Sequence, residues 1–217
     1  MAYTGHGTTA DPDQRAKRTE AARPAGPVFA QRVPFGAMLI ITGITGWVAA
    51  GILILEKLEL YRDPDHVTSC DINPWVSCGQ VMETWQSELF GFPNPFIGLV
   101  GFSIIITTGM ALLAGARFAR WYWLGLQVGV TLGAVFAVWL WSQALFDIYI
   151  LCLYCMIVWA AMIPLVILTT LRNLAQGVIP APAGLTRWLT DWVGPIIALT
   201  YIAVAASVFF RFLHVFT

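Results

Sequence analysis

The chain has 217 residues, of which 58% are hydrophobic and only 11% are charged, and its mean hydropathy is +0.72. Soluble domains average about 25% charged residues, so the composition excludes an ordinary soluble domain and indicates an integral membrane protein. The formal net charge is zero, so no overall basic surface indicates nucleic-acid binding.

Residues 1–33 differ from the rest of the chain. They are rich in Ala, Gly, Pro, Thr and charged residues and hold few bulky apolar side chains. Such a segment cannot bury enough surface to offset its ordering entropy, so we expect a disordered tail. A cleavable signal peptide is excluded, because a long polar stretch precedes a full-length apolar run.

Five apolar runs follow, over residues 34–55, 95–116, 121–146, 148–171 and 193–213. A bilayer core of about 30 Å needs about 20 helical residues, so each run is long enough to cross. The third and fourth runs nearly touch, which predicts a tight turn at Phe146 and Asp147. Pro164 lies inside the fourth run and should kink it. The sequence therefore predicts an all-α membrane protein.

The basic residues predict the orientation of these spans. If five spans alternate, nine of the twelve Lys and Arg residues fall on one side, which includes residues 1–33. Cytoplasmic loops carry the excess of Lys and Arg, so we expect the N-terminus in the cytoplasm, in a cell membrane. The loop of residues 56–94 then lies outside, and residues 172–192 form a cytoplasmic loop before the fifth span.

All four cysteines should lie at the outer face. Cys70 and Cys78 belong to the outer loop, and Cys152 and Cys155 belong to the first two turns of the fourth span. Disulfides persist on that side of a membrane. Inert structural disulfides or buried thiols remain possible for both pairs.

The C-x-x-C pair favours redox chemistry over a structural role. A bridge between Cys152 and Cys155 closes a short loop and so adds little stability, whereas strained bridges are the labile ones. The position near a helix N-terminus favours a thiolate. Zinc is disfavoured because thiolate sites are hard to maintain in an oxidising compartment, and haem attachment would need His where Met156 stands.

The outer loop also carries an amphipathic pattern. Val81, Trp85 and Leu89 recur at i, i+4 and i+8, flanked by Met82 and Phe90. This spacing predicts a short helix on the membrane surface, which would cover the end of the bundle.

The cysteine pattern resembles that of the vitamin K epoxide reductase family, in its bacterial members. The resemblance rests on Cys70-Asp71, on Cys78, on Asn94 ahead of the motif PFIG, and on the Cys152-Leu153-Tyr154-Cys155 motif. It covers about residues 35–171. It implies a four-helix core over residues 34–171 around a quinone, with an additional helix within residues 172–217.

The resemblance also implies roles for individual residues. Cys70 would exchange with a redox partner, Cys78 would pass electrons to Cys152, and Cys155 would face the quinone ring. Asn94 would donate a hydrogen bond to a quinone carbonyl. The other expected ring contacts are Trp159, which stands where the animal enzymes have tyrosine, and Met82, Trp85, Phe96 and Tyr149.

Menaquinone or ubiquinone is the cofactor that a bacterial member implies. Many bacterial relatives carry a fused thioredoxin-like domain, which these 217 residues lack. We therefore expect the partner to be a separate, exported thioredoxin-fold protein similar to DsbA.

Three other functions fit parts of this pattern. A DsbB-type oxidase performs the same reaction, but its C-x-x-C pair lies in the first outer loop, the reverse of the order here. A structural membrane subunit with inert disulfides would not reduce quinone. A transporter is disfavoured because the spans carry almost no ionisable residues.

The expected orientation can be tested by thiol labelling. Once reduced, all four cysteines should react with membrane-impermeant thiol reagents only from outside, because the basic residues place them there. Labelling of Cys70 in inverted vesicles but not in intact cells would reverse the topology.

Overall fold

The computed structural model describes residues 27–213. Its elements, in chain order, are η1 (Val28–Ala30), α2 (Arg32–Arg62), α3 (Cys78–Met82), η2 (Trp85–Glu88), α4 (Pro95–Leu113), α5 (Arg120–Gln143), η3 (Ala144–Ile148), α6 (Leu153–Ala175), α7 (Ala183–Asp191) and α8 (Val193–Arg211). Five of the helices are long and apolar enough to cross a membrane, so the expected all-α, multi-pass membrane fold is confirmed.

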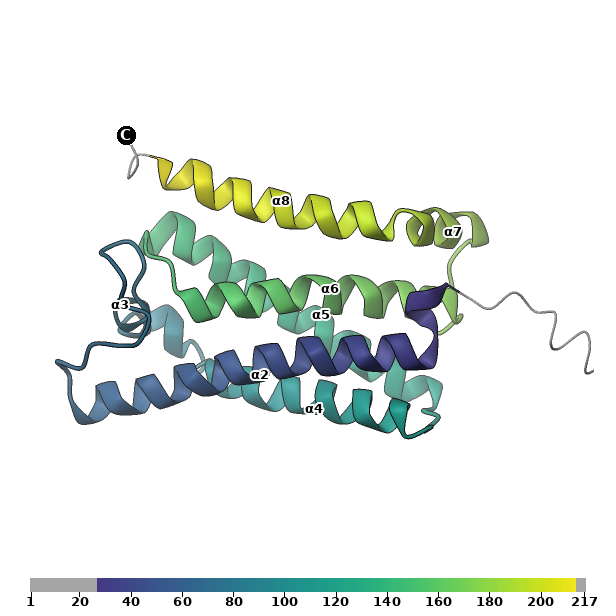
Figure 1. Ribbon diagram of the computed structural model, residues 1–217, viewed down its shortest axis with the longest axis horizontal. Coiled ribbons are helices and arrows are strands. Elements are labelled where there is room, and N and C mark those ends of the chain that lie inside the picture. The colour runs from purple at the N-terminus through teal and green to yellow at the C-terminus, as the bar shows by residue number, and fades with distance from the viewer. Residues whose placement is uncertain (1–26, 214–217) are drawn as a thin grey trace, which may run out of the picture.

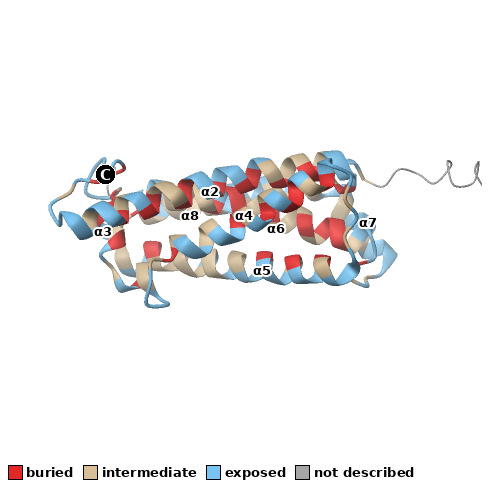
Figure 2. Cartoon of the chain, turned by 90° about the horizontal axis from the view of Figure 1, so that it is seen from below, coloured by how far each residue is buried: buried red, intermediate tan, exposed pale blue. Residues whose placement is uncertain are grey.

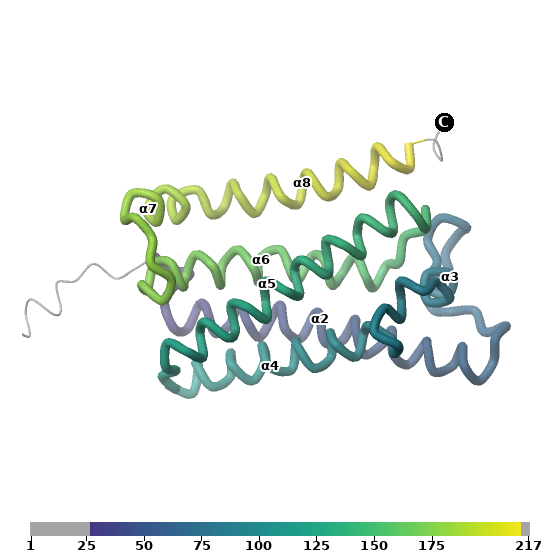
Figure 3. Tube along the Cα trace, turned by 180° about the vertical axis from the view of Figure 1, so that it is seen from behind, coloured from purple at the N-terminus to yellow at the C-terminus, as the bar shows by residue number. Residues whose placement is uncertain are grey.

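Helices α2, α4, α5 and α6 form a four-helix bundle (Figure 1). Helix α2 packs along α4 and α6, and α5 packs against α6. Helix α8 lies outside the bundle and contacts α6 (Figure 3). The segment with α3 and the end of α8 lie at one end of the bundle, and η1 and α7 lie at the other.

Glycines let α2 and α4 approach closely. A Cβ atom at Gly46 would lie 2.2 Å from the Phe102 ring, and one at Gly109 would lie 2.8 Å from the carbonyl oxygen of Gly36. Helices in lipid associate through such close packing, because the bilayer supplies no hydrophobic driving force between them. Helices α2 and α4 are therefore closely packed along their length.

The buried residues concentrate on the surfaces where these helices meet, and the outward surfaces are exposed and apolar (Figure 2). The proportion of buried residues is highest in α2, much lower in α5, and zero in the apolar window of α8. Exposed Leu, Ile, Val and Phe side chains on these helices are the surface that lipid would cover.

The first long helix begins earlier than expected and ends later. Residues 1–26 of the expected tail lie outside the described residues, but Ala30 is buried and α2 begins at Arg32. At its other end α2 extends to Arg62. The ammonium group of Lys57 donates to the carbonyl oxygen of Met82 at 2.6 Å and pairs with Glu88 at 2.9 Å. These partners let a charged residue continue the helix.

The turn between the third and fourth spans lies later than expected. Phe146 and Asp147 belong to the π-helical turn η3, and the chain reverses direction after it at Tyr149, whose φ is +59°. Arg211 of α8 stabilises this reversal. Its Nε donates to the carbonyl oxygen of Leu145 at 2.8 Å, and its guanidinium carbon lies 4.3 Å from the centre of the Tyr149 ring.

The single amphipathic helix expected around residues 81–90 is replaced by two short elements, α3 and η2. Hydroxyl groups compete for the backbone here: Thr84 donates to the carbonyl oxygen of Val81, and Ser87 donates to that of Met82, each at 2.7 Å. Such local bonds interrupt a helix. Helix α7 was not expected at all, whereas α6 continues through Pro164 as one helix.

Candidate redox site

The first cysteine pair is joined in the structure. Cys70 and Cys78 form a disulfide with Cα atoms 5.6 Å apart, and both residues are fully buried. Cys78 is the first residue of α3, whose N-cap is Ser77. The Ser77 hydroxyl accepts a hydrogen bond from the Gln80 amide at 3.1 Å, which fixes the start of this helix beside the disulfide.

The second pair lies at the start of α6 and is not bonded. Cys152 is the N-cap residue, and its sulfur accepts a hydrogen bond from the Cys155 amide at 3.3 Å. Cys152 is buried, whereas Cys155 is half-buried. The helix N-terminus therefore contacts the sulfur of Cys152 directly.

The two pairs meet through Cys78 and Cys152, whose sulfur atoms lie 3.3 Å apart. A disulfide bond is about 2.05 Å long, so an exchange between these sulfurs requires a shift of only about 1 Å. Backbone pairing sets this register. The amide of Ser77 donates to the carbonyl oxygen of Leu151 at 3.0 Å, and the amide of Leu151 donates to that of Trp75 at 2.8 Å.

Asp71 holds the loop that carries the first pair. Its carboxylate accepts from the Thr68 amide at 2.8 Å, the Ser77 hydroxyl at 2.6 Å and the Gly79 amide at 3.2 Å. Burial alone would raise the pKa of Asp71, but the hydrogen bonds from Ser77, Thr68 and Gly79 outweigh it and hold the pKa below its usual value. The charged carboxylate thus ties together the segments on either side of the disulfide.

Three of the sulfurs are also close enough to share a metal ion. Those of Cys70, Cys78 and Cys152 all lie within 4.8 Å of one another. A sulfur in a disulfide has no thiolate charge to offer a metal. In the state that the structure shows, this cluster is therefore arranged for thiol–disulfide exchange and not for metal binding.

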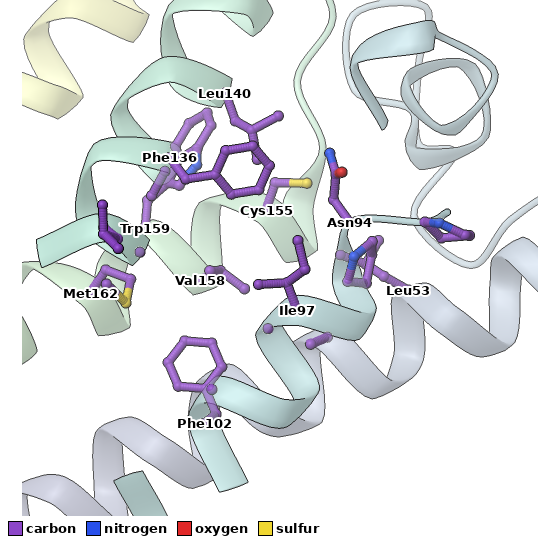
Figure 4. Close-up of a pocket in the computed structure, with 18 of the residues that line it drawn as sticks. Leu53, Asn94, Ile97, Phe102, Phe136, Leu140, Cys155, Val158, Trp159 and Met162 are labelled. Carbon is purple, nitrogen blue, oxygen red and sulfur yellow. The ribbon is translucent and has the colours of Figure 1, made fainter. Parts of the chain in front are cut away.

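A large apolar cavity adjoins the second pair. It has a volume of about 820 Å³ and is bounded by all four bundle helices and by the segment of α3 and η2. In Figure 4 the sulfur of Cys155 and the side chains of Asn94, Phe136, Leu140 and Trp159 point into one space. Its size is within the range of pockets that bind small organic molecules.

Asn94 is the polar group of this cavity that has bonding capacity to spare. It is 7% exposed, and its Nδ2 donates one hydrogen bond, to the carbonyl oxygen of Gln86 at 2.6 Å. Its Oδ1 is buried and has no hydrogen-bond partner among residues 27–213. A buried unpaired polar atom is costly, so a bound molecule with a polar group would stabilise this position.

The structure brings together some of the expected contact residues and not others. Met82, Asn94 and Trp159 line the cavity with Cys152 and Cys155. Trp85, Phe96 and Tyr149 lie outside its lining.

Each of these three residues has a different surrounding. Trp85 is 64% exposed and contacts Trp139, with ring centres 6.1 Å apart. Phe96 is 40% exposed, and the first turns of α4 line the cavity with Pro95, Ile97, Gly98 and Gly101 instead. The ring of Tyr149 packs against the guanidinium group of Arg211, whose carbon lies 4.3 Å from the ring centre.

The face of α5 is the part of the cavity that sequence reasoning missed. Gly125, Gly129 and Gly133 line the cavity from one side of α5, together with Phe136 and Leu140. A Cβ atom at Gly125 or Gly129 would meet nothing within 4 Å. The spacing of four between these glycines was the available signal, and it marks the side of α5 that faces the open space.

Two cysteine pairs in contact at one end of an apolar bundle are the arrangement expected of a membrane thiol oxidoreductase. The Vitamin K epoxide reductase family (VKOR) matches the chain over residues 37–170. The chain therefore belongs to this family, and the expected resemblance is confirmed. A comparison with curated proteins gave no match.

The role of Asp71 can be tested by Asp71→Asn. Because the pKa of Asp71 is lowered in the folded protein, its carboxylate stabilises the fold above its ordinary pKa, and this contribution is lost as the pH falls through the folded value. The free energy of unfolding of the variant should be about 1.5–3 kcal/mol lower at pH 7. It should also fall less than that of the unmodified protein as the pH is lowered. Unfolding in detergent between pH 3 and pH 7 measures both effects.

Asp65→Asn is the matched control, since Asp65 is an exposed carboxylate of the same loop. It should behave as the unmodified protein does. If Asp71→Asn also unfolds like the unmodified protein at every pH, the carboxylate does not hold this loop.

Proposed function

We propose that the protein is a quinone-dependent thiol oxidase. It would take two electrons from the dithiol of a thioredoxin-fold protein, pass them through its two cysteine pairs, and deliver them to a membrane quinone. The observation that carries this proposal is the 3.3 Å contact between the sulfurs of Cys78 and Cys152, with Cys155 beyond them on the cavity wall.

The relay consists of balanced exchange steps. A partner thiolate attacks Cys70, and after the partner's second thiol closes its own disulfide, Cys70 and Cys78 are left reduced. The Cys78 thiolate then attacks Cys152 in a Cys152–Cys155 disulfide, and Cys155 leaves as a thiolate. Cys70 next attacks Cys78, which restores their disulfide and releases Cys152. The net result is a reduced Cys152–Cys155 pair and an oxidised partner.

The disulfide state of the structure corresponds to the end of this sequence. Cys70 and Cys78 are bonded, while Cys152 and Cys155 are not. The hydrogen bond from the Cys155 amide to the sulfur of Cys152 would stabilise the charge that develops on that sulfur when Cys70 attacks Cys78. Both thiols of the reduced pair line the cavity.

The residues of the cavity fit a quinone. Asn94 can donate its second amide hydrogen to a carbonyl oxygen of the ring and can accept, at Oδ1, from a hydroxyl of the reduced ring. Trp159 and Phe136 offer flat apolar surfaces, and the glycine face of α5 leaves room for an apolar tail. Menaquinone and ubiquinone both meet these requirements. The quinone would supply an acceptor for two electrons and two protons.

The partner must overcome the burial of Cys70. Cys70 is fully buried and packs with Leu53, Cys78 and Met82, so the loop around it has to shift before a partner thiolate can attack. Val67 and Ile72, on either side of Cys70, are exposed apolar residues. They would give a thioredoxin-fold protein of the outer side an apolar surface to bind.

The relay can be tested with Cys70→Ser. Without Cys70 the bridge between Cys78 and Cys152 cannot be resolved outward, so it should accumulate and leave Cys155 as a thiol. Peptide mass spectrometry of the non-reduced protein, oxidised in the presence of quinone, measures the bridge. The double variant Cys70→Ser, Cys152→Ser is the control and should form none.

A different result would refute the relay. If Cys70→Ser shows a free Cys78 beside an intact Cys152–Cys155 disulfide, with quinone present, the loop pair does not feed the second pair. The proposed function would then lose its supporting observation.

The cavity can be tested with two matched tryptophan variants. Trp159→Ala should reduce turnover of an added soluble quinone about tenfold or more, through lost ring contact. Asn94→Ala should reduce it roughly 2–13-fold, for one hydrogen bond. Trp85→Ala, outside the lining, should leave it unchanged.

Quinone reduction by a chemical dithiol, measured for KM and kcat, gives these values, and unfolding midpoints show whether each variant is folded. Folded variants of Trp159 and Asn94 with unaltered kinetics would place quinone binding elsewhere.

A further inference from the structure

A second cavity lies at the other end of the bundle, where α2 begins and α6 ends (Figure 1). It has a volume of about 480 Å³. Four arginines from different parts of the chain line it: Arg32, Arg117, Arg120 and Arg172. No Asp or Glu belongs to its lining within residues 27–213. The cavity therefore concentrates positive charge.

Arg172 is held deep in this cavity. It is 9% exposed, its guanidinium carbon lies 3.4 Å from the centre of the Trp123 ring, and its Nη1 donates to Asn173 Oδ1 at 3.0 Å. Both partners are neutral. The stacking orients the guanidinium, and no carboxylate of the described residues 27–213 pairs with its charge.

Within residues 27–213 the other three arginines have no acidic partner either. The Nε of Arg120 donates to the carbonyl oxygen of Val178 at 3.0 Å, and Nη1 of Arg32 donates to that of Gly115 at 3.2 Å. Arg117 makes no hydrogen bond or ion pair within residues 27–213. A guanidinium has five N–H donors, so each of these groups keeps donors for a further partner.

Two helix N-termini add to the positive potential of the cavity. The N-termini of α2 and α5 both reach the cavity, neither has a side-chain cap, and neither has an acidic residue in its first turn. Unpaired amides at a helix N-terminus favour an anion. The C-terminus of α6 carries partial negative charge, which opposes anion binding and would by itself account for the position of Arg172. It does not account for the other three arginines.

Membrane topology alone does not account for this arrangement. The excess of basic residues at one end of the spans would be satisfied by arginines pointing anywhere into water, whereas these four converge on one cavity. Residues 1–26 hold four basic and three acidic side chains, so their charge offers no net compensation.

We propose that this cavity binds a phosphate group. Guanidinium groups match phosphate oxygens with paired hydrogen bonds. The cavity lies at the ends of apolar spans, the depth at which lipid headgroups occur, and basic pockets between membrane helices bind anionic headgroups. The phosphate could belong to an anionic phospholipid or to a soluble phosphate compound. The site is remote from the cysteines and does not depend on the proposed redox function.

The experiment compares both sources on the full-length protein in a neutral detergent. Thermal unfolding is followed while phosphatidylglycerol, inorganic phosphate or phosphatidylcholine is added, and native mass spectrometry counts retained lipid. The midpoint should rise saturably with the phosphate source that binds and not with phosphatidylcholine, since a ligand of the folded state stabilises it.

Arg117→Gln is the informative variant, because Arg117 makes no bond to the described chain that the substitution could break. It should weaken the apparent affinity about fivefold. Arg187→Gln is its matched control, since Arg187 is an exposed arginine of α7 outside the cavity. The control should leave the affinity unchanged.

The outcomes separate the sources. A response to phosphatidylglycerol alone, reduced by Arg117→Gln, assigns the site to a lipid headgroup, and a response to inorganic phosphate assigns it to a soluble compound. No response to either, or an equal loss in Arg117→Gln and Arg187→Gln, overturns the proposal, because only general surface charge would then be involved.

Discussion

The contact between the sulfurs of Cys78 and Cys152 is the constraint on which the rest of the site depends. These residues are 74 positions apart, and a shift of a few ångströms would abolish any exchange between them. The short parallel pairing of Val76 with Leu151 supplies the register, because each of these residues lies within two positions of its cysteine. The redox site is thus positioned by backbone hydrogen bonds and not by the cysteines themselves.

Polar contacts keep the segment of α3 and η2 closed over the apolar cavity. The ammonium group of Lys57 donates to the carbonyl oxygen of Met82. The side-chain amide of Gln86 donates to Asp147 of η3, and the side-chain amide of Asn94 donates to the carbonyl oxygen of Gln86. These groups would be costly to bury unpaired, so they stabilise one arrangement of the cover. Met82 of the cover also packs in one buried cluster with Cys70, Cys78 and Cys152.

The two ends of the bundle differ in the kind of side chain that they hold. One end holds four cysteines beside an apolar cavity, and the other holds four arginines around a smaller polar cavity. Helix α8, which buries little, contributes at the cysteine end through Arg211. That arginine supports the strained Tyr149 backbone just before Cys152. The fifth span therefore contacts the turn on which the position of the second cysteine pair depends.

The sequence by itself determined the membrane class, the number of spans, the positions of the cysteine pairs and the family. These features are local: apolar runs of about 20 residues and fixed motif spacings can be read along the chain. Asn94, Met82 and Trp159 were expected near the second pair for the same reason, since they belong to or adjoin the motifs.

Only the tertiary structure decided which side chains share a space. It displaced Trp85, Phe96 and Tyr149 from the cavity, divided the expected amphipathic helix into α3 and η2, and turned the glycine face of α5 inward. It also gathered four arginines from separate segments. Rotation of a helix about its axis and competition between side-chain and backbone hydrogen bonds govern these outcomes, and both depend on neighbours that are distant in the sequence.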